Sequence, residues 1–232
     1  MTESTNEMHP SPRAIGILWL VYVVVGIPSL YLLKGIVVTG AAVATAQNIL
    51  AHPALFQASA SIDLVANALY IALTACLYGL FRPVNRSFAL TAAFFSLTGC
   101  IVQIVAGLLR IVPPIILGDA HLASAFTAAQ LQSSVMLGLA LYSKAFFISF
   151  PLFALFELVT GYLMLKSTFV PRWLGVWWVI AGVFWLIFLW PPLAVLVQRY
   201  IIALGGPTEI AFAVWLIVKG NDAWGRRQMS TA

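Results

Sequence analysis

Hydrophobic residues fill the chain in long runs that short polar stretches interrupt. A helix needs about 20 mostly apolar residues to cross the hydrocarbon core of a bilayer, and runs of this length recur from residue 14 almost to the C-terminus. The runs lack the alternation of polar and apolar residues that a barrel strand shows. Because the backbone must pair internally inside a bilayer, the pattern predicts an all-α fold, a polytopic transmembrane helix bundle of about six spans.

Polar stretches and turn-forming residues set the expected limits of the spans. We expect spans over residues 14–36, 58–81, 87–112, 144–165, 173–189 and 207–219. Residues 41–51 predict a short interfacial helix, and residues 118–132 predict a second polar connection. Residues 133–143 are expected to form an interfacial or tilted segment, and Gly205-Gly206-Pro207 is expected to open the sixth span.

Charged residues are few and unevenly placed. Only 8% of the 232 residues are charged, against about 25% in a typical soluble domain, so the composition excludes a soluble globular protein. Basic residues beside spans mark the cytoplasmic side of a membrane, which accounts for the net charge of +5 without nucleic acid as a partner. Eight basic residues fall on one side of the spans and four on the other: Arg13, Arg82, Arg86, Lys166, Arg172, Lys219, Arg226 and Arg227 against Lys34, Arg110, Lys144 and Arg199.

This asymmetry predicts that both termini lie in the cytoplasm. The expected domain organisation is a disordered cytoplasmic tail over residues 1–13, a single transmembrane domain over residues 14–220 and a second cytoplasmic tail over residues 221–232. The predicted location is the inner, or cytoplasmic, membrane.

Ionisable side chains inside spans are rare and mark candidate functional sites. In the second span, Asp63, Asn67 and Tyr70 follow one another on one helical face. In the third span, Gln103 and Arg110 lie seven residues apart and also share a face. We expect these residues to line a polar cavity near the outer leaflet. The purely structural alternative is hydrogen bonding between helices together with an ion pair of Asp63 and Arg110.

Two glutamates complete the candidate cavity. Glu157 lies well inside the fourth span, where a carboxyl group should be protonated, paired or exposed to a wet cavity. Glu209 falls in the first turn of the predicted sixth span, where a carboxylate can cap free backbone N–H groups. His52 and His121 are interpreted as loop residues, since no spacing of His or Cys is typical of a metal site. We expect no metal and no cofactor.

The loop between the second and third spans has the sequence Arg82-Pro83-Val84-Asn85-Arg86. Pro83 and Asn85 suit a tight turn, and both arginines suit the cytoplasmic headgroups. With this motif the chain resembles a bacterial membrane family known as domain of unknown function 4386. Further matching pieces extend the resemblance from about Arg13 to Gly220: Ala46–Phe56, Asp63, Gly161-Tyr162-Leu163, Pro171-Arg172, Leu174-Gly175-Val176 and Glu209–Gly220.

The resemblance implies a compact bundle of about six spans in a bacterial membrane, with the arginine-containing hairpin at the cytoplasmic face. It also implies that the acidic residues Asp63 and Glu209 occupy acidic positions of the family. Members of the family often carry a histidine in the fourth span near the glycine of the Gly-Tyr-Leu motif, where this chain has Phe156 and Glu157. The resemblance implies no particular activity.

Three functions stay open. The protein binds or transports a small ligand through an outward-facing polar cavity, or it is an intramembrane enzyme that acts on a lipid or isoprenoid substrate with Glu157 or Asp63 as general acid or base. The third alternative is a non-catalytic module that assembles in the membrane, as a homo-oligomer or with other proteins. All three share the lipid bilayer as a partner, and the sequence does not decide whether the chain is an enzyme. We favour the first because its candidate residues share a depth near the outer leaflet: Asp63, Asn67, Gln103, Arg110 and Glu209.

Overall fold

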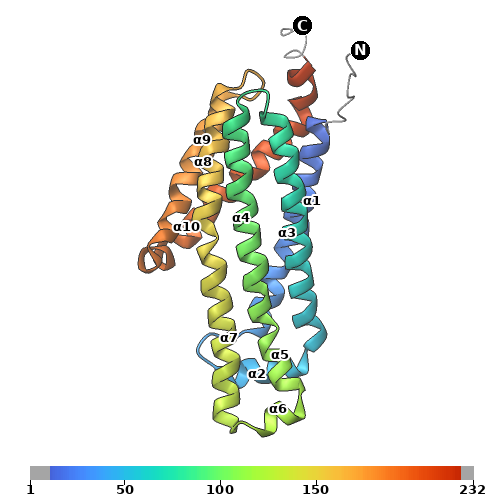
Figure 1. Ribbon diagram of the computed structural model, residues 1–232, viewed down its shortest axis with the longest axis vertical. Coiled ribbons are helices and arrows are strands. Elements are labelled where there is room, and N and C mark those ends of the chain that lie inside the picture. The colour runs from blue at the N-terminus through green and yellow to red at the C-terminus, as the bar shows by residue number, and fades with distance from the viewer. Residues whose placement is uncertain (1–10, 226–232) are drawn as a thin grey trace. The chain divides into compact units, whose positions relative to one another are not determined.

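The computed structural model describes residues 11–225, except for the side chains of Leu30, Leu122 and Ala123, as a nearly continuous series of helices (Figure 1). The helices are α1 Pro12–Ile36, α2 Ala42–Ala51, α3 Pro53–Phe81, α4 Arg86–Arg110, α5 Val112–Gly118, α6 Ala120–Ser124, α7 Ala128–Ile148, α8 Phe150–Lys166, α9 Arg172–Trp185, η1 Leu186–Leu189, α10 Pro191–Trp215 and η2 Leu216–Gly220. No strand occurs within residues 11–225. The predicted all-α fold class is therefore confirmed.

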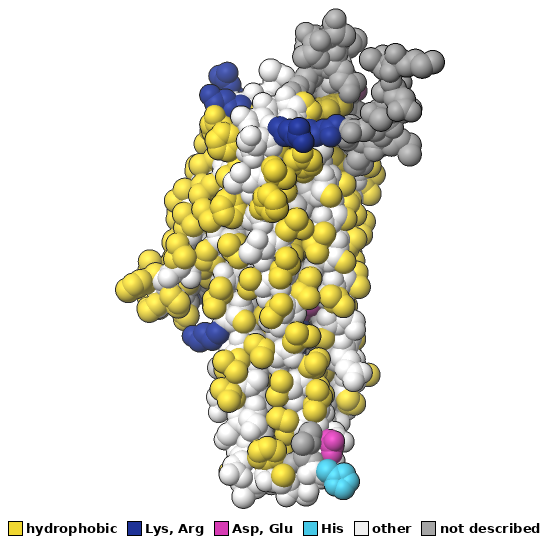
Figure 2. Space-filling model, viewed as in Figure 1, with side chains coloured by type: hydrophobic (Ala, Val, Ile, Leu, Met, Phe, Trp, Pro, Cys, Tyr) yellow, Lys and Arg dark blue, Asp and Glu magenta, His cyan; other side chains and the backbone are white. Residues whose placement is uncertain are grey.

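Six helical runs among the described residues are long and apolar enough to cross a membrane. They are Pro12–Ile36, Pro53–Phe81, Arg86–Gly118, Ala128–Lys166, Arg172–Leu189 and Pro191–Gly225. On the face shown in Figure 2, hydrophobic side chains predominate and Lys and Arg occupy few positions. Large apolar side chains such as Val24, Phe94 and Leu196 are more than half exposed. Because such a surface suits lipid rather than water, the chain is a transmembrane helix bundle, as the hydrophobic runs predicted.

The described chain divides into two compact units. The first unit takes residues 11–20, Ile71–Leu97 and 151–225, and the second takes Val21–Tyr70 and Thr98–Phe150. The chain passes from one unit to the other within α1, α3 and α4 and again at the beginning of α8. Compact units of one bundle need not be separate domains, so the single transmembrane domain over residues 14–220 stays a prediction. Most of both predicted tails, residues 1–10 and 226–232, falls outside the described residues.

Small residues bring α8 and α9 close together in the first unit. A β-carbon at Gly161 of α8 would lie 2.7 Å from Val179 Cγ2 on α9. A β-carbon at Gly182 of α9 would lie 3.1 Å from the main-chain oxygen of Ala154 on α8. Larger side chains at these positions would separate the helices. After η1 the chain turns, and α10 packs beside α9 (Figure 1).

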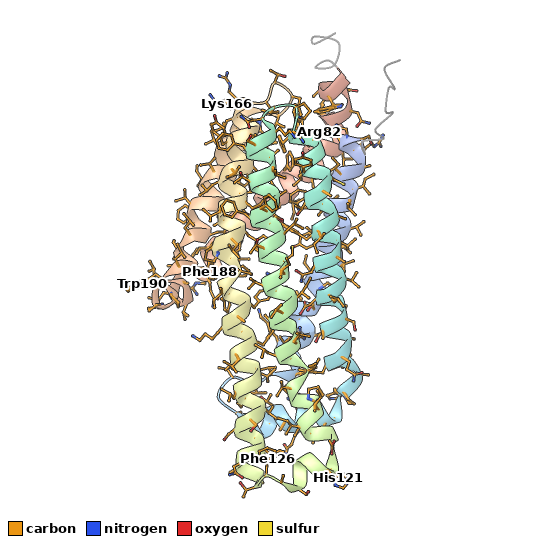
Figure 3. The ribbon with its side chains drawn as sticks, in the orientation of Figure 1. Arg82, His121, Phe126, Lys166, Phe188 and Trp190 are labelled. Atoms are coloured by element: carbon orange, nitrogen blue, oxygen red, sulfur yellow. The ribbon has the colours of Figure 1, made fainter. Side chains whose placement is uncertain are left out.

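The two ends of the first unit differ in character. Figure 3 shows Arg82 and Lys166 at one end of this unit and Trp190 at the opposite end. Arg82 belongs to the turn between α3 and α4, where Asn85 Oδ1 accepts a hydrogen bond from Phe88 N at 3.0 Å and so caps α4. The predicted tight turn is therefore confirmed. The predicted end of the fifth span near residue 189 is confirmed as well, because η1 ends at Leu189.

The second unit has a core of its own, formed by Ile36, Ile49, Phe56, Val135 and Leu139. Helix α2 contributes to this core, and its bounds confirm the predicted short helix. Side chains of α2 hold the preceding turn, since Asn48 Nδ2 donates to the main-chain oxygen of residue 36 at 3.0 Å. Helix α7 begins with a capping box of Thr127 and Gln130.

The predicted beginning of the sixth span is wrong. Helix α10 runs through Gly205-Gly206-Pro207 without a break. A loop inside hydrocarbon would leave backbone groups without water to pair with, so the helix persists. Beside the proline, Thr208 Oγ1 donates a hydrogen bond to Leu204 O at 2.9 Å. Glu209 therefore lies in the interior of α10, and its expected role as an N-terminal cap is wrong.

The helix boundary before the fourth span also differs from the prediction. Helices α7 and α8 meet at Ser149, not at residues 143–144. Pro151 has no N–H to continue the helical hydrogen bonds, and Ser149 Oγ donates to Phe146 O at 2.7 Å. The segment expected to lie at the interface, residues 133–143, is part of α7. The expected connection over residues 118–132 contains α6 and the first turn of α7.

Candidate functional site

Asp63 and Arg110 form an ion pair in the second unit. Arg110 Nη1 donates to Asp63 Oδ2, and Arg110 Nη2 donates to Ser59 Oγ. Ser29 Oγ donates to Asp63 Oδ1, and Tyr142 OH donates to Asp63 Oδ2 at 3.3 Å. The five side chains come from α1, α3, α4 and α7. We call this set the Arg110 cluster: Ser29, Ser59, Asp63, Arg110 and Tyr142.

Aromatic rings cover the guanidinium group of Arg110. Its Cζ lies 4.9 Å from the ring centroid of Tyr142 and 5.6 Å from that of Phe56, which is within the range of cation–π attraction. The Arg110 side chain is 1% exposed, whereas the Asp63 side chain is 29% exposed. The cluster is thus closed around its cation and open at its carboxylate. Within the described residues Arg110 Nε has no hydrogen-bond partner, so one buried donor is unsatisfied.

Three other residues of the predicted cavity have contacts of their own. The Asn67 amide donates to the main-chain oxygen of Asp63, one turn earlier in α3, at 2.9 Å. The Tyr70 ring packs on a tyrosine ring of α1 with centroids 4.9 Å apart. Gln103 Nε2 donates to Ser149 Oγ at 3.0 Å. The structure therefore brings Asp63 and Arg110 together and gives Asn67, Tyr70 and Gln103 separate partners.

The two glutamates lie in the first unit, on α8 and α10. Trp19 Nε1 donates a hydrogen bond to Glu209 Oε2 at 3.3 Å. Glu157 is only 4% exposed, and its Oε2 has no hydrogen-bond partner within residues 11–225. The two carboxyl groups lie in the same unit and interact electrostatically.

Three buried aromatic residues, one of them the Trp19 that binds Glu209, pack against one another. The ring centroids of Trp19 and Trp178 are 5.5 Å apart, and Phe212 lies 5.8 Å from Trp19 and 5.1 Å from Trp178, all edge to face. Among the described residues, the indole Nε1 of Trp178 also lacks a hydrogen-bond partner. We call the whole set the glutamate cluster: Trp19, Glu157, Trp178, Glu209 and Phe212. Its polar groups are two carboxyls and two indole N–H donors.

The predicted cavity joined Glu209 to Asp63 and Arg110. In the structure Glu209 belongs to the first unit with Glu157, and Asp63 and Arg110 belong to the second. A single cavity lined by both sets stays a prediction. Of the predicted hairpin motif, Asn85 caps the beginning of α4.

Sequence reasoning missed several members of both clusters. Ser29 is a hydroxyl in the long apolar run of α1, and Tyr142 stands two residues before Lys144 in an apolar stretch. Either could have been noticed as a polar group at span depth. Trp19 and Trp178 carry no such signal, because tryptophans in spans usually pack against lipid or neighbouring helices. Only the fold shows that the N–H group of Trp19 binds the carboxyl group of Glu209.

His, Cys, Asp and Glu side chains nowhere gather in threes within residues 11–225, and most metal sites in proteins need at least three such ligands.

A family model described as "Domain of unknown function (DUF4386)" matches residues 14–220. Comparison with curated proteins gives no match, and comparison with solved structures gives none either. The match covers both units and both polar clusters.

Proposed function

The chain belongs to the family described as Domain of unknown function (DUF4386), and on that premise we propose that it is a multi-pass protein of the bacterial cytoplasmic membrane that binds or transports a small polar ligand at the Arg110 cluster. The bundle of six membrane-length helices supports the membrane location. The asymmetry of basic residues supports a topology with both termini in the cytoplasm.

In this topology the Arg110 cluster is at the outer side. The turn between α3 and α4 carries Arg82 and Arg86, which we assign to the cytoplasmic face. Asp63 precedes Arg82 by 19 residues, and Arg110 follows Arg86 by 24. A single crossing takes about 20 residues, so both members of the ion pair come at the end of a crossing. A ligand would reach them from outside the cell.

One observation carries the proposal: a nearly inaccessible arginine has an unsatisfied Nε, and its partner Asp63 is partly exposed. Burying an ion pair gives little net stability compared with apolar packing, so stability alone does not explain the cluster. An acceptor oxygen of a ligand would satisfy Nε. The carboxylate of Asp63 beside it would repel a simple anion, and this favours a zwitterion that presents an anionic oxygen to Arg110 and a cationic group to Asp63.

Thermal unfolding of the purified full-length chain in detergent tests this proposal. The probes are glycine as a zwitterion, with acetate and inorganic phosphate as simple anions. We expect glycine to raise the melting temperature of the wild type most. Arg110→Lys keeps the positive charge but removes Nε and the planar fork, so it should abolish the shift.

Arg199→Lys is the matched control, because Arg199 is exposed and stacks on Tyr200 at 4.7 Å from the ring centroid. It should respond to glycine as the wild type does. If no probe shifts the melting temperature, the proposed ligand class is wrong. If Arg110→Lys and the wild type respond equally, the ligand does not bind at the Arg110 cluster.

A further inference from the structure

We propose that Glu157 and Glu209 form a proton-binding site in the interior of the membrane, with the proton on Glu157 and the negative charge on Glu209. This inference is independent of ligand binding at the Arg110 cluster. It rests on the convergence of four helices, on the charges of the surrounding residues and on the burial of the side chains in the glutamate cluster.

Helix packing brings the cluster together. The close approach of α8 and α9 at Gly161 and Gly182 places Trp178, which lies between Gly175 and Gly182 on α9, beside the turn of α8 that contains Glu157. Trp178 in turn contacts the Trp19 ring of α1 and the Phe212 ring of α10. The cluster is therefore a consequence of the packing of α1, α8, α9 and α10.

Position along the helices places both acids far from water. Glu157 precedes Lys166 by nine residues, and Glu209 precedes Lys219 by ten. At about 1.5 Å per residue these separations are about 14–15 Å. This is about half of a hydrocarbon core of about 30 Å. Both lysines stand near the ends of their spans, so the two carboxyls lie near the middle of the membrane.

No compensating cation stands near the acids along these helices. The basic residues closest in sequence to members of the cluster lie six to ten residues away: Arg13, Lys166, Arg172, Arg199 and Lys219. A small pocket between α3, α4 and α8 is lined by Phe156 and Thr160, next to Glu157, and Tyr78 is its titratable residue. A phenol is uncharged near neutral pH. The electrostatic neighbour of Glu157 is the other acid, Glu209.

Two adjacent carboxylates in a low-dielectric interior cannot both keep their charge without a counter-ion. At least one of them must take up a proton from water. The hydrogen bonds indicate that this proton lies on Glu157. Glu209 accepts the indole N–H of Trp19, and such a bond favours the charged form. Glu157 has no partner at Oε2, and the neutral acid tolerates burial better than the ion.

The available space and donors favour a proton over a larger cation. Trp19, Trp178 and Phe212 are at most 1% exposed and Glu157 is 4% exposed, whereas Glu209 is partly exposed. A proton on Glu157 needs no cavity. A metal cation would need several oxygen ligands, whereas the indole group of Trp19 presents an N–H donor to Glu209. This donor stabilises a carboxylate and repels a cation.

Infrared spectroscopy of the full-length protein in lipid nanodiscs tests the proposal. A protonated carboxyl group has a carbonyl absorption distinct from that of a carboxylate and of an amide. At neutral pH we expect the wild type to show one such band assigned to a buried acid. Glu157→Gln should abolish this band, and Glu209→Gln should leave it in place with a shifted position. Asp222→Asn is the matched control, because Asp222 is exposed, and it should leave the band unchanged.

Two results would overturn the proposal. One is a wild-type spectrum without a protonated-acid band at neutral pH, or a band that persists in Glu157→Gln. The other is loss of the band on adding Na⁺, K⁺ or choline at constant pH, which would assign the site to a cation. If Glu157→Gln does not fold, titration of the wild type decides the question. The band must then disappear as the pH rises and return as it falls.

Discussion

The Arg110 cluster and the glutamate cluster are both polar groups buried within helical units, but they differ in charge. The first joins an acid to a base and fills most of the hydrogen-bonding capacity of both, through Ser29, Ser59 and Tyr142. The second joins two acids and leaves Glu157 Oε2 unpaired. Opposite charges neutralise each other within the fold, whereas like charges require a proton from outside it. Burial alone therefore does not distinguish an ion pair from a titrating site.

The largest expected difference between the two clusters is in the free energy of unfolding when one member of each cluster is replaced. Arg110→Ala leaves Asp63 without its counter-ion and should lower the free energy of unfolding by about 3 kcal/mol, the lower end for a buried pair because Asp63 is partly exposed. Glu157→Gln replaces an uncharged acid with an uncharged amide of similar shape and should change it by less than about 1 kcal/mol. Unfolding by SDS in mixed micelles measures both changes.

Arg199→Ala controls for the loss of an arginine as such. Arg199 is exposed, so its removal should have an effect within about 0.5 kcal/mol. The comparison of the clusters would fail if Glu157→Gln destabilised the protein as much as Arg110→Ala. That result would mean that Glu157 carries a charge and has a partner in the folded state.

A smaller loss of stability is expected from a substitution that disturbs only the glutamate cluster. A β-carbon at Gly161 meets Val179 Cγ2 at 2.7 Å and the backbone nitrogen of Val179 at 3.0 Å. Gly161→Ala should therefore push α8 from α9 and destabilise the protein by about 1–3 kcal/mol. It should also shift the protonated-acid band of Glu157, because the helix contact aligns the cluster.

Gly107→Ala is the matched control, since nothing lies within 4 Å of a β-carbon at Gly107. It should be neutral or stabilise the helix by up to about 1 kcal/mol. Equal effects of the two substitutions on stability and on the band would contradict the packing account.

Much of the fold could be predicted from the sequence because its signals are local. Long apolar runs gave the spans, and the turn at Asn85 and the helix α2 followed from residues within each segment. The prediction failed where the environment overrides local preference. Gly205-Gly206-Pro207 would form a loop in water, but in hydrocarbon the helix continues because a loop would leave backbone groups unpaired.

The candidate site shows a similar limit. Asp63 and Arg110 could be paired from the sequence because opposite charges in neighbouring spans attract each other. The association of Glu157 with Glu209 could not be predicted, since these acids are 52 residues apart and like charges give no reason to expect contact. Their meeting depends on the packing of glycines and tryptophans from α1, α8, α9 and α10. Such contacts arise from the tertiary fold and leave no local pattern.

The pH dependence of unfolding is the most direct test of the distinction between the two clusters. If the folded protein holds a proton on Glu157 that the unfolded chain releases, the folded state binds more protons, and stability falls as the pH rises above the ordinary glutamate range, by up to about 1.4 kcal/mol per pH unit. We predict this decline for the wild type and for Asp63→Asn, and its absence in Glu157→Gln. A decline that persists unchanged in Glu157→Gln, or that disappears in Asp63→Asn, would contradict the account.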